Sequence, residues 1–385
     1  MRMLVLGGGL MGRAAAYDMC RQPDVDGVVI ADIDEAKALE AAKFARSDVA
    51  AARRLDVHDR AAVLGLMKDA DACLGAVSYT VNLELSKLAV EAGTHFNDMG
   101  GNNTVVAAQL ELDAAAKKAG VSIIPDTGLA PGMVCPLAMH GVRRMDEAES
   151  VRIRVGGLPQ NPQPPLDYML VFSVQGLINE YVEPCVAIQD GKVVDDLEPL
   201  VDIEEIEFPA PFGTLEAFNT SGGTSTLPTT LLGKVRSLNY KTIRFPGHAA
   251  KMRAMLELGL MESEPIDVRG ASVAPRDLFE TLLDRHLPHG DDDIVLVRVT
   301  VEGTKSGRAS RAVYEMIDYR DEETGLTAMM RGTALPSSII CLMAARGETP
   351  PGATPQELAI DGDRLIEELR ARGLPLRIAV DGEEQ

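Results

Sequence analysis

Three glycines near the start of the chain have the spacing of a phosphate-binding turn. The segment GGGLMG at residues 7–12 matches the pattern GxGxxG and directly follows the apolar run at residues 2–6. In this pattern the first glycine makes a tight turn, the second lets a pyrophosphate approach the backbone, and the third lets a helix pack closely on a strand. The free N–H groups at the start of that helix attract phosphate charge. The segment therefore predicts a dinucleotide site formed by Gly7, Gly9, Leu10, Met11 and Gly12.

A carboxylate in the next apolar run indicates which dinucleotide binds. Asp32 lies twenty residues beyond Gly12, within the run GVVIADID at residues 27–34. A carboxylate at this place accepts hydrogen bonds from the ribose hydroxyls of NAD, and it would repel the 2′-phosphate of NADP. The residues that follow, Ile33 and Asp34, supply no cation to hold that phosphate. We therefore predict NAD as the cofactor.

Further cofactor contacts are expected where later strands end, because ligands of a doubly wound sheet bind beyond the carboxyl ends of its strands. The third strand should end beside the adenine and the fourth beside the dinucleotide. For Tyr79 a packing role is an equal alternative, since one aromatic residue in a loop carries little information. Gly128 and Pro131 are better suited to shaping the backbone than to chemistry. The full set is Asp56, Val57, Ala76, Val77, Ser78, Tyr79, Gly128 and Pro131.

The elements that position these residues alternate between apolar β-rich runs and Ala-rich helical runs. Six such strands separated by helices predict a parallel, doubly wound Rossmann sheet for residues 1–131. The helical residues 60–69, 81–92 and 105–119 separate the later strands. The expected strands are residues 2–6, 27–34, 53–59, 70–78, 94–100 and 121–126.

The pattern changes at about residue 132, where strands joined by turns replace the regular alternation. Residues 132–335 are therefore expected to form a second, α+β domain that binds substrate and supports oligomerisation. Its last part, residues 291–336, contains three β-rich stretches with Gly-containing turns, which predict an antiparallel meander. We expect residues 336–385 to be helical and to pack back onto the first domain. The fold class is thus α/β with a second domain built on a largely antiparallel sheet.

Composition limits the classes of partner. The 385 residues suit two domains, and no apolar run approaches the roughly 20 residues of a membrane helix. The net charge of −20 repels nucleic acid and anionic lipid, and five scattered cysteines suggest neither disulfides nor a metal site. The first residues enter a strand without the pattern of a signal peptide. We expect a cytoplasmic homodimer or homotetramer that binds a small amino-acid substrate, with no nucleic acid, membrane or metal.

Two longer motifs resemble a known superfamily. The segments NDMGG at 97–101 and PDTGLAPGM at 125–133 resemble motifs of the saccharopine dehydrogenase superfamily. Within that superfamily, the irregular segments at 156–181, 212–227 and 238–252 are similar to those of the L-lysine 6-dehydrogenases. The resemblance spans most of the chain. It implies NAD-dependent oxidation of the side-chain amine of L-lysine to 2-aminoadipate 6-semialdehyde, which cyclises to piperideine-6-carboxylate, with release of ammonia.

One departure from the saccharopine-forming relatives bears on the substrate. Those relatives carry an Arg in the segment that corresponds to residues 221–224, which read Ser-Gly-Gly-Thr here. The missing cation implies a substrate with fewer carboxylates than saccharopine, as free lysine has. We place Thr224 of this segment among the substrate-binding residues.

The implied reaction needs a clamp for a carboxylate and groups that move a proton, because hydride leaves carbon readily only from a neutral amine. Arg244 could bind the α-carboxylate with two parallel hydrogen bonds. Lys241 is a catalytic candidate, but in a strand it would project to the opposite face from Arg244, so one of the two is expected to be structural. His248, after Pro246-Gly247, has a suitable pKa for proton transfer, with a loop or capping role as the alternative.

Two aspartates and three residues after a Pro-rich segment complete the candidates. Asp98 and Asp126 end strands near the expected nicotinamide, and either could attract the ammonium or orient water; the alternative is capping of the following turn. Tyr168 and Phe172 could line the aliphatic chain of lysine, with core packing as the alternative, and Glu180 could face the α-amino group. Two other functions stay open: a saccharopine dehydrogenase or reductase on the same scaffold, and a non-catalytic NAD-sensing protein.

Overall fold

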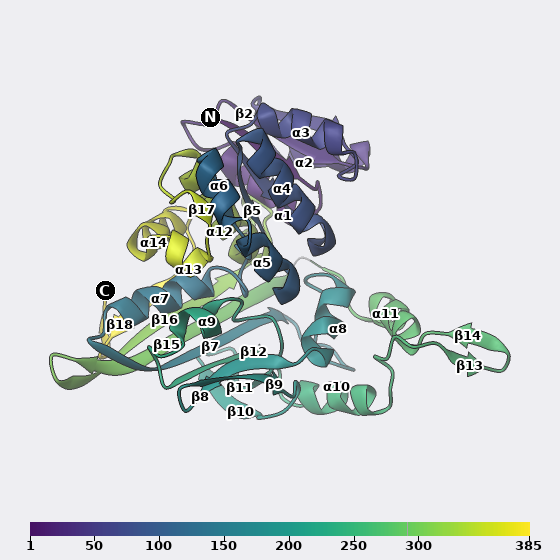
Figure 1. The fold of residues 1–385 in the computed structure, drawn as a ribbon. Helices are drawn as coiled ribbons and strands as arrows, with labels where there is room; N and C mark the ends of the chain where they lie inside the picture. Colours follow the sequence, from purple (N-terminus) through teal and green to yellow (C-terminus); the bar gives the residue numbers. More distant parts are fainter. Residues whose placement is uncertain (291) are drawn as a thin grey trace. The chain divides into compact units, whose positions relative to one another are not determined.

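A seven-stranded parallel sheet organises the first of two compact units in the computed structural model, which describes residues 1–290 and 292–385 (Figure 1). This unit comprises Met1–Arg143, Ser225–Leu227 and Met330–Leu376. Its strands lie in the order β17-β6-β5-β4-β1-β2-β3, so six of them follow the Rossmann order and β17 extends one edge. The strands are β1 (Arg2–Leu6), β2 (Gly27–Asp32), β3 (Ala50–Arg54), β4 (Ala72–Gly75), β5 (His95–Asp98), β6 (Ser122–Ile124) and β17 (Gly352–Ala353).

Helices connect these strands and cover the sheet. Apolar strand side chains such as Leu4, Leu6 and Phe96 form its core with Val63 and Met67 of α3. The helices of the unit are α1 (Leu10–Met19), α2 (Glu35–Ala45), α3 (Arg60–Lys68), α4 (Asn82–Ala92), α5 (Asn103–Leu110), α6 (Asp113–Ala119), α7 (Val134–Arg143), α12 (Ala328–Ala345), α13 (Gln356–Ala359) and α14 (Gly362–Ala371), with a 3-10 turn at Tyr79–Val81.

Two local expectations in this unit are corrected. The third strand covers residues 50–54 rather than 53–59, because Asp56 accepts a hydrogen bond from the His58 amide and Asp59 caps α3 through the Ala62 amide. Aspartate side chains that bind nearby backbone in this way favour turns and helix starts over strand. The helical run at 105–119 is divided between α5 and α6.

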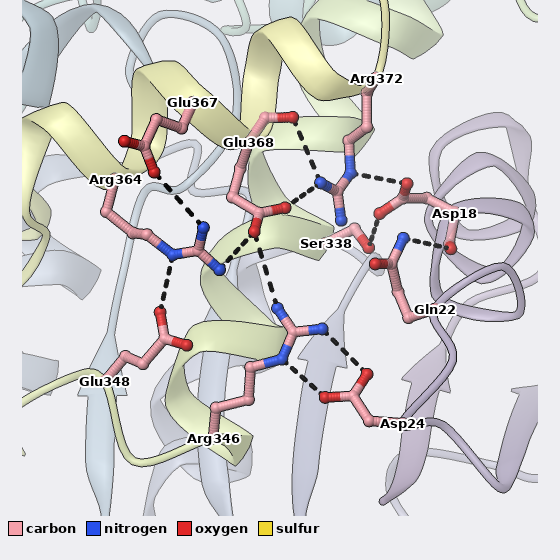
Figure 2. Close-up of polar contacts among 10 residues, drawn as sticks. All are labelled: Asp18, Gln22, Asp24, Ser338, Arg346, Glu348, Arg364, Glu367, Glu368 and Arg372. Atoms are coloured by element: carbon pink, nitrogen blue, oxygen red, sulfur yellow. Dashed lines mark hydrogen bonds and ion pairs between the residues drawn. The ribbon is translucent and has the colours of Figure 1, made fainter.

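The C-terminal helices belong to the first unit and are joined to α1 by an ionic network (Figure 2). The Nε atom of Arg372 donates to Oδ1 of buried Asp18 at 2.7 Å, and Ser338 donates to Oδ2 of the same carboxylate at 2.6 Å. The two guanidinium N–H groups of Arg346 bind Asp24 at 2.8 and 2.9 Å. Glu368 connects these pairs through Arg372, Arg364 and Arg346.

A ten-stranded, mostly antiparallel sheet organises the second unit, which comprises Arg144–Thr224, Pro228–Met329 and Arg377–Gln385. The strand order is β10-β11-β12-β7-β15-β16-β18-β19, with β8 paired to both β12 and β9, and only β12 and β7 run parallel. The strands are β7 (Glu147–Pro159), β8 (Cys185–Gln189), β9 (Lys192–Leu197), β10 (Glu204–Phe208), β11 (Gly213–Asn219), β12 (Ser237–Arg244), β15 (Asp293–Lys305), β16 (Arg308–Tyr319), β18 (Arg377–Val380) and β19 (Glu383–Glu384).

The second unit also contains a separate hairpin of β13 (Ile266–Val268) and β14 (Ala271–Val273). Its helices are α8 (Val174–Val182), α9 (Leu227–Leu231, whose first residue belongs to the first unit), α10 (His248–Glu257) and α11 (Pro275–His286). The mostly antiparallel sheet confirms the expected fold class.

Three segments differ from their expected assignment. The meander has two long strands, β15 and β16, because the third expected stretch begins α12, where residues 328–335 (AMMRGTAL) are rich in helix formers. Residues 134–143, expected in the second domain, form α7 of the first unit. Residues 377–385 form strands of the second unit rather than helix. Helix α12 is long and apolar enough to span a membrane by composition, yet 89% of it is buried, as in the core helix of a soluble protein.

Candidate active site

The glycine turn has the steric features that a dinucleotide requires. Gly7 has a φ of +105°, and a Cβ there would lie 2.3 Å from the Ala76 carbonyl oxygen. A Cβ on Gly12 would lie 1.8 Å from the Gly7 carbonyl oxygen, so the glycine allows α1 to approach the turn. At Gly9 a Cβ would meet no atom within 4 Å, which leaves its surface open. A pyrophosphate could therefore come close to the backbone of this turn, although its binding stays a prediction.

Helix α1 begins directly after this turn, and the first N–H groups of the helix have no side-chain cap. Gly9 is the N-cap residue and supplies no side-chain hydrogen bond, and the first turn contains no acidic residue. Leu10 is 47% exposed and Met11 is partly buried. A helix end with uncapped N–H groups and no carboxylate attracts an anion.

The ends of the neighbouring strands surround the glycine turn. The carboxylate of Asp32 accepts hydrogen bonds from the amides of Gly8 and Asp34 at 2.8 and 2.9 Å, so it holds the turn, and its contact with a ribose stays a prediction. Arg54 of β3 lies opposite Asp32 in the strand register and is exposed. The Ala76 amide donates to Leu6 at 2.7 Å. Asp56 and Ser78 are exposed, whereas Val57, Val77 and Tyr79 are partly buried.

Asp98 and Asp126 lie together in a buried polar network of the first unit, but their bonding differs. Asp98 is fully buried, and its carboxylate accepts from the Gly100 amide at 2.8 Å and from Gln109 Nε2 at 2.7 Å. Burial raises its pKa and these hydrogen bonds oppose the rise. With both oxygens engaged, Asp98 organises the turn after β5, which favours its structural alternative over catalysis.

Asp126, in contrast, retains a free oxygen. Its Oδ2 accepts a hydrogen bond from Ser225, while its buried Oδ1 has no hydrogen-bond partner among the described residues. Gly100, at a φ of +78°, makes room for it, since a Cβ there would lie 1.8 Å from Oδ1. Burial, followed by the charge of Asp98, raises the pKa of Asp126 to about 7. A carboxylate with this pKa can accept and release protons near neutral pH.

Gly128 and Pro131 belong to a turn that folds closely on itself. A Cβ on Gly132 would lie 1.8 Å from the Gly128 carbonyl oxygen, and one on Gly128 would contact Thr333 of α12. Both residues thus shape the backbone before α7. In the described part of the chain no group of three or more His, Cys, Asp or Glu residues could hold a metal.

The second unit contains a separate polar cluster around Arg244. The side chain of Arg244 is 2% exposed, and its guanidinium lies over the ring of Tyr168 at 4.8 Å. Its Nη2 atom is 3.8 Å from Oε2 of Glu180, close enough for an ion pair and too far for a hydrogen bond. Burial, opposed by Arg244, raises the pKa of Glu180 to about 7. Although 26% of the Glu180 side chain is accessible, its Oε2 atom is buried.

Three buried polar atoms of this cluster have no hydrogen-bond partner among the described residues: Arg244 Nε, Glu180 Oε2 and the Tyr168 hydroxyl. Buried polar atoms are nearly always paired, so a group of orphans indicates a ligand or water. Together they offer a cationic donor, an anionic acceptor and a hydroxyl. This combination matches the carboxylate and ammonium of an α-amino acid.

The segment at residues 220–224 lies on the same side of β12 as Arg244. Tyr240 and Thr242 share the Arg244 face, as the period of two in a strand requires. Thr242 bonds to Thr220 at 2.6 Å, and a Cβ on Gly223 would lie 2.4 Å from the Tyr240 ring. Thr224, 5% exposed, is part of this buried segment. Phe172 is half-buried and packs against the apolar core of the unit.

Two catalytic candidates are corrected by their surroundings. Lys241 projects to the opposite face of β12, where its Nζ lies 3.0 Å from both Asp202 Oδ2 and Glu204 Oε2. It is a buried structural cation. His248 is 1% exposed, and its two ring nitrogens bond to the Leu166 carbonyl and the Tyr181 hydroxyl, each at 3.0 Å.

Burial and the nearby Arg244 lower the pKa of His248 to about 3, so its ring is neutral and Nδ1 donates to Leu166. A histidine with both nitrogens engaged has no free position for a substrate proton. It supports Tyr181 and the cluster instead. The sequence reasoning missed Tyr181, Tyr240 and Ser225, whose partners are distant in the sequence and leave no local signal.

Family models match most of the chain. A family model described as the saccharopine dehydrogenase NADP binding domain matches residues 3–124, and one described as the saccharopine dehydrogenase C-terminal domain matches residues 128–374. The chain belongs to the saccharopine dehydrogenase family. The predicted superfamily is thereby confirmed, while the lysine 6-dehydrogenase group stays a prediction.

Curated members of this family are distant relatives. The saccharopine dehydrogenase [NADP(+), L-glutamate-forming] of Saccharomyces cerevisiae is 22% identical over 73% of this chain and 63% of the yeast protein. The protein of that name from Pyricularia oryzae is 23% identical over 54% of this chain and 48% of its own length. The mouse mitochondrial alpha-aminoadipic semialdehyde synthase is 22% identical over 68% of this chain and 29% of its length. The matches thus span less than two thirds of each relative.

A solved structure shows the fold of the family. The apo saccharopine dehydrogenase (L-Glu forming) from Saccharomyces cerevisiae superimposes with a TM-score of 0.80 at 19% identity, covering 98% of this chain and 99% of that chain. The similarity confirms an α/β fold with a parallel nucleotide-binding sheet and a mostly antiparallel second sheet.

Proposed function

We propose that this member of the saccharopine dehydrogenase family oxidises the side-chain amine of free L-lysine and uses NAD. Family membership supports a pyridine-nucleotide dehydrogenase. The observation that carries the choice of substrate is the trio of unpaired buried atoms around Arg244. The products would be 2-aminoadipate 6-semialdehyde and ammonia.

In the second unit, Arg244 would bind the α-carboxylate of lysine, with the Tyr168 hydroxyl as a second donor. Oε2 of Glu180 would accept from the α-ammonium. Each of these bonds gives a partner to an atom that lacks one, and charged hydrogen bonds of this kind contribute about 1.5–3 kcal/mol. The gap of 3.8 Å between Arg244 and Glu180 leaves the two charges free to bind opposite charges of the same ligand.

The single cation of the cluster favours lysine over saccharopine. Arg244 is the cation whose charge acts on Glu180, and residues 221–224 contain no Arg or Lys. Lys241, the residue before Thr242, is held on the other face of β12 by Asp202 and Glu204. One guanidinium suits one carboxylate, whereas saccharopine would bring three into the protein.

In the first unit, three features of the glycine turn fit a pyridine dinucleotide. The backbone turns tightly at Gly7, the space beside Gly9 is free of other atoms, and the N-terminus of α1 has no side-chain cap. The chemistry that this dinucleotide would supply is acceptance of a hydride from the carbon that bears the amine. Asp32 would hold the adenosine ribose and disfavour a 2′-phosphate. The family model is named for NADP, and Arg54 beside Asp32 is a feature that favours that cofactor.

Asp126 is the group that we assign to proton transfer. The amine must lose a proton before it loses hydride, and the resulting imine must then add water to yield aldehyde and ammonia. Oδ1 of Asp126 is buried, unpaired and has a pKa of about 7. It can accept the ammonium proton in the first step and release it to solvent. In the second step the carboxylate can take a proton from the attacking water and pass it to the departing nitrogen, so that aldehyde and ammonium form with one proton released overall.

The test is to mix the purified protein with NAD or NADP and with L-lysine, saccharopine or L-ornithine, and to measure reduced nucleotide and ammonia. We expect both products with NAD and lysine alone. In parallel, Arg244→Lys should raise the KM for lysine, whereas the matched control Arg154→Lys changes another Arg of the second unit that is 4% exposed and pairs with Glu204. The control should leave KM unchanged.

The results separate the proposal from its alternatives. Reduction of nucleotide with saccharopine and without lysine would select the saccharopine dehydrogenase activity named for the curated relatives. Binding of NAD without turnover on any of these amino acids would select a nucleotide-sensing protein. Equal effects of the Arg244 and Arg154 substitutions would remove Arg244 from substrate binding.

A further inference from the structure

A hairpin arm in the second unit extends away from the sheet of that unit. The arm runs from Glu262 to Arg276, and the Arg276 amide closes its base by donating to the Glu262 carbonyl at 3.0 Å. Between these ends, β13 and β14 form a sheet of two strands, and Figure 1 shows them beyond the end of α11. Arg269 and Gly270 have φ values of +55° and +88°, as a two-residue hairpin turn requires.

One face of this arm is entirely apolar. Ile266 lies opposite Val273, and Val268 lies opposite Ala271, so cross-strand pairing places all four on the same face. The other face carries the pair of Asp267 and Ser272. The side chains of Ile266 and Val268 are 51% and 46% exposed.

Most of that face is uncovered among the described residues, because Ile266, Val268 and Ala271 are exposed and Val273 is partly buried. An isolated two-stranded hairpin is marginally stable in water, and exposed apolar surface on such an element marks an interaction site. We propose that the arm is a dimerisation element whose apolar face packs on the arm of a second copy of this chain, about a two-fold axis.

The charges of the arm identify a second copy as the partner. Its root carries Glu262, Glu264 and Arg276, of which Arg276 pairs with Glu280 of α11, whereas its tip carries Arg269. A two-fold axis perpendicular to the two arms aligns them antiparallel, which places each basic tip beside the acidic root of the other arm. The apolar faces are then also self-complementary. One symmetric contact therefore covers both apolar faces and pairs both tips.

The other surfaces and partners are less suited. The long meander strand β16 pairs with β18 along its middle residues 312–315, so that part of its edge is occupied within the same chain. The net charge of −20 repels anionic membranes and nucleic acid. The arm itself has more acidic than basic residues at its root. A neutral contact between apolar faces with matched charges at their ends avoids this repulsion.

The test measures the mass of the full chain in solution by analytical ultracentrifugation across a range of concentrations. We expect a dimer for the wild type and at least a tenfold higher dissociation constant for Ile266→Thr/Val268→Thr. The control is Ile203→Thr, which changes an apolar residue of the same unit that is 53% exposed. The dissociation constant of Ile203→Thr should equal that of the wild type. At concentrations where all three proteins are monomeric, their melting temperatures should agree.

A charge swap tests the antiparallel arrangement. Arg269→Glu and Glu264→Lys should each weaken the dimer, and the combination Glu264→Lys/Arg269→Glu should restore it. A monomeric wild type, an oligomer that persists in the Ile266→Thr/Val268→Thr variant, or a swap that restores nothing would overturn the proposal. Flotation of the wild type with anionic lipid vesicles, lost in the same double variant, would overturn it in favour of a membrane.

Discussion

Nη2 of Arg244 and Oε2 of Glu180 lie 3.8 Å apart without a hydrogen bond between them. The Arg244 guanidinium is buried over the ring of Tyr168, and Arg244 Nε and Glu180 Oε2, both buried and without a partner, can each form a hydrogen bond with a ligand. A pair that is close but incompletely bonded costs stability without a ligand and gains it when one binds. Binding of an amino acid should therefore stabilise the protein, and the pH dependence of binding should report on Glu180.

The first prediction concerns the KM for lysine. Glu180 must be ionised to accept the α-ammonium, and burial raises its pKa to about 7. KM should therefore fall as the pH rises through about 7, and Glu180→Gln should flatten this profile and raise KM by roughly tenfold or more at pH 8. Because Glu180 binds rather than reacts, kcat should change much less. An unchanged KM profile in Glu180→Gln would contradict the assignment.

The second prediction concerns stability at Asp126. Its pKa in the folded protein is about 7 against 3.8 ordinarily, so the folded state binds the proton more tightly than the unfolded state does. The buried carboxyl therefore lowers the free energy of unfolding least below pH 4, where it is protonated in both states. It lowers this free energy increasingly as the pH rises to about 7. Asp126→Asn should raise the free energy of unfolding at pH 8 by on the order of 2 kcal/mol, and it should abolish turnover.

Urea denaturation at pH 5 and pH 8 measures this effect, with the exposed Asp48→Asn as the control. The gain should be smaller at pH 5, where Asp126 is already protonated in the wild type. An Asp126→Asn variant that is less stable than the wild type at pH 8 would show that the free carboxylate is a structural requirement.

The third prediction concerns the choice of nucleotide. Asp32→Asn keeps an acceptor for the turn but removes the charge that disfavours a 2′-phosphate. The ratio of affinities for NAD and NADP should shift toward NADP by roughly tenfold, or about 1.4 kcal/mol. Isothermal titration with both nucleotides reports this ratio, which a general loosening of the turn would not change. Arg54→Ala serves as the companion: a large loss of NADP affinity in that variant would identify Arg54 as the phosphate ligand.

The fourth prediction concerns the pair of Arg372 and Asp18 (Figure 2). Burial raises the pKa of Asp18 and Arg372 opposes that rise. Removal of the cation in Arg372→Met leaves a buried carboxylate without its charge partner, which costs about 3–5 kcal/mol. The loss should be largest at pH 8 and shrink toward pH 5, because protonation then neutralises Asp18.

A double-mutant cycle with Asp18→Asn checks this pair. The double variant Asp18→Asn/Arg372→Met should be more stable than Arg372→Met alone at pH 8, since no buried charge is left unpaired. Additive losses in the cycle would indicate that Asp18 and Arg372 act independently.

Local chemistry was readable from the sequence, whereas distant contacts were not. The turn at Gly7 and Gly12 is defined by neighbouring residues, and the period of a strand was enough to place Lys241 and Arg244 on opposite faces. The role of His248 could not be read in this way, because its neutral state depends on Tyr181 and Leu166, which are remote in the chain. The same holds for Asp126, whose Ser225 partner follows ninety-nine residues later.

The path of the chain between the two units sets the order in which they can be completed. The chain leaves one unit for the other after residues 143, 224, 227, 329 and 376. The edge strand β17 and the partners of Asp18 are consequently translated only after nearly all of the second unit. During synthesis, the outer edge of β6 in the nucleotide-binding sheet stays unpaired until β17 has been translated. Neither unit can be obtained by truncating the gene at one place, and a nascent chain stopped before residue 352 would expose an open sheet edge.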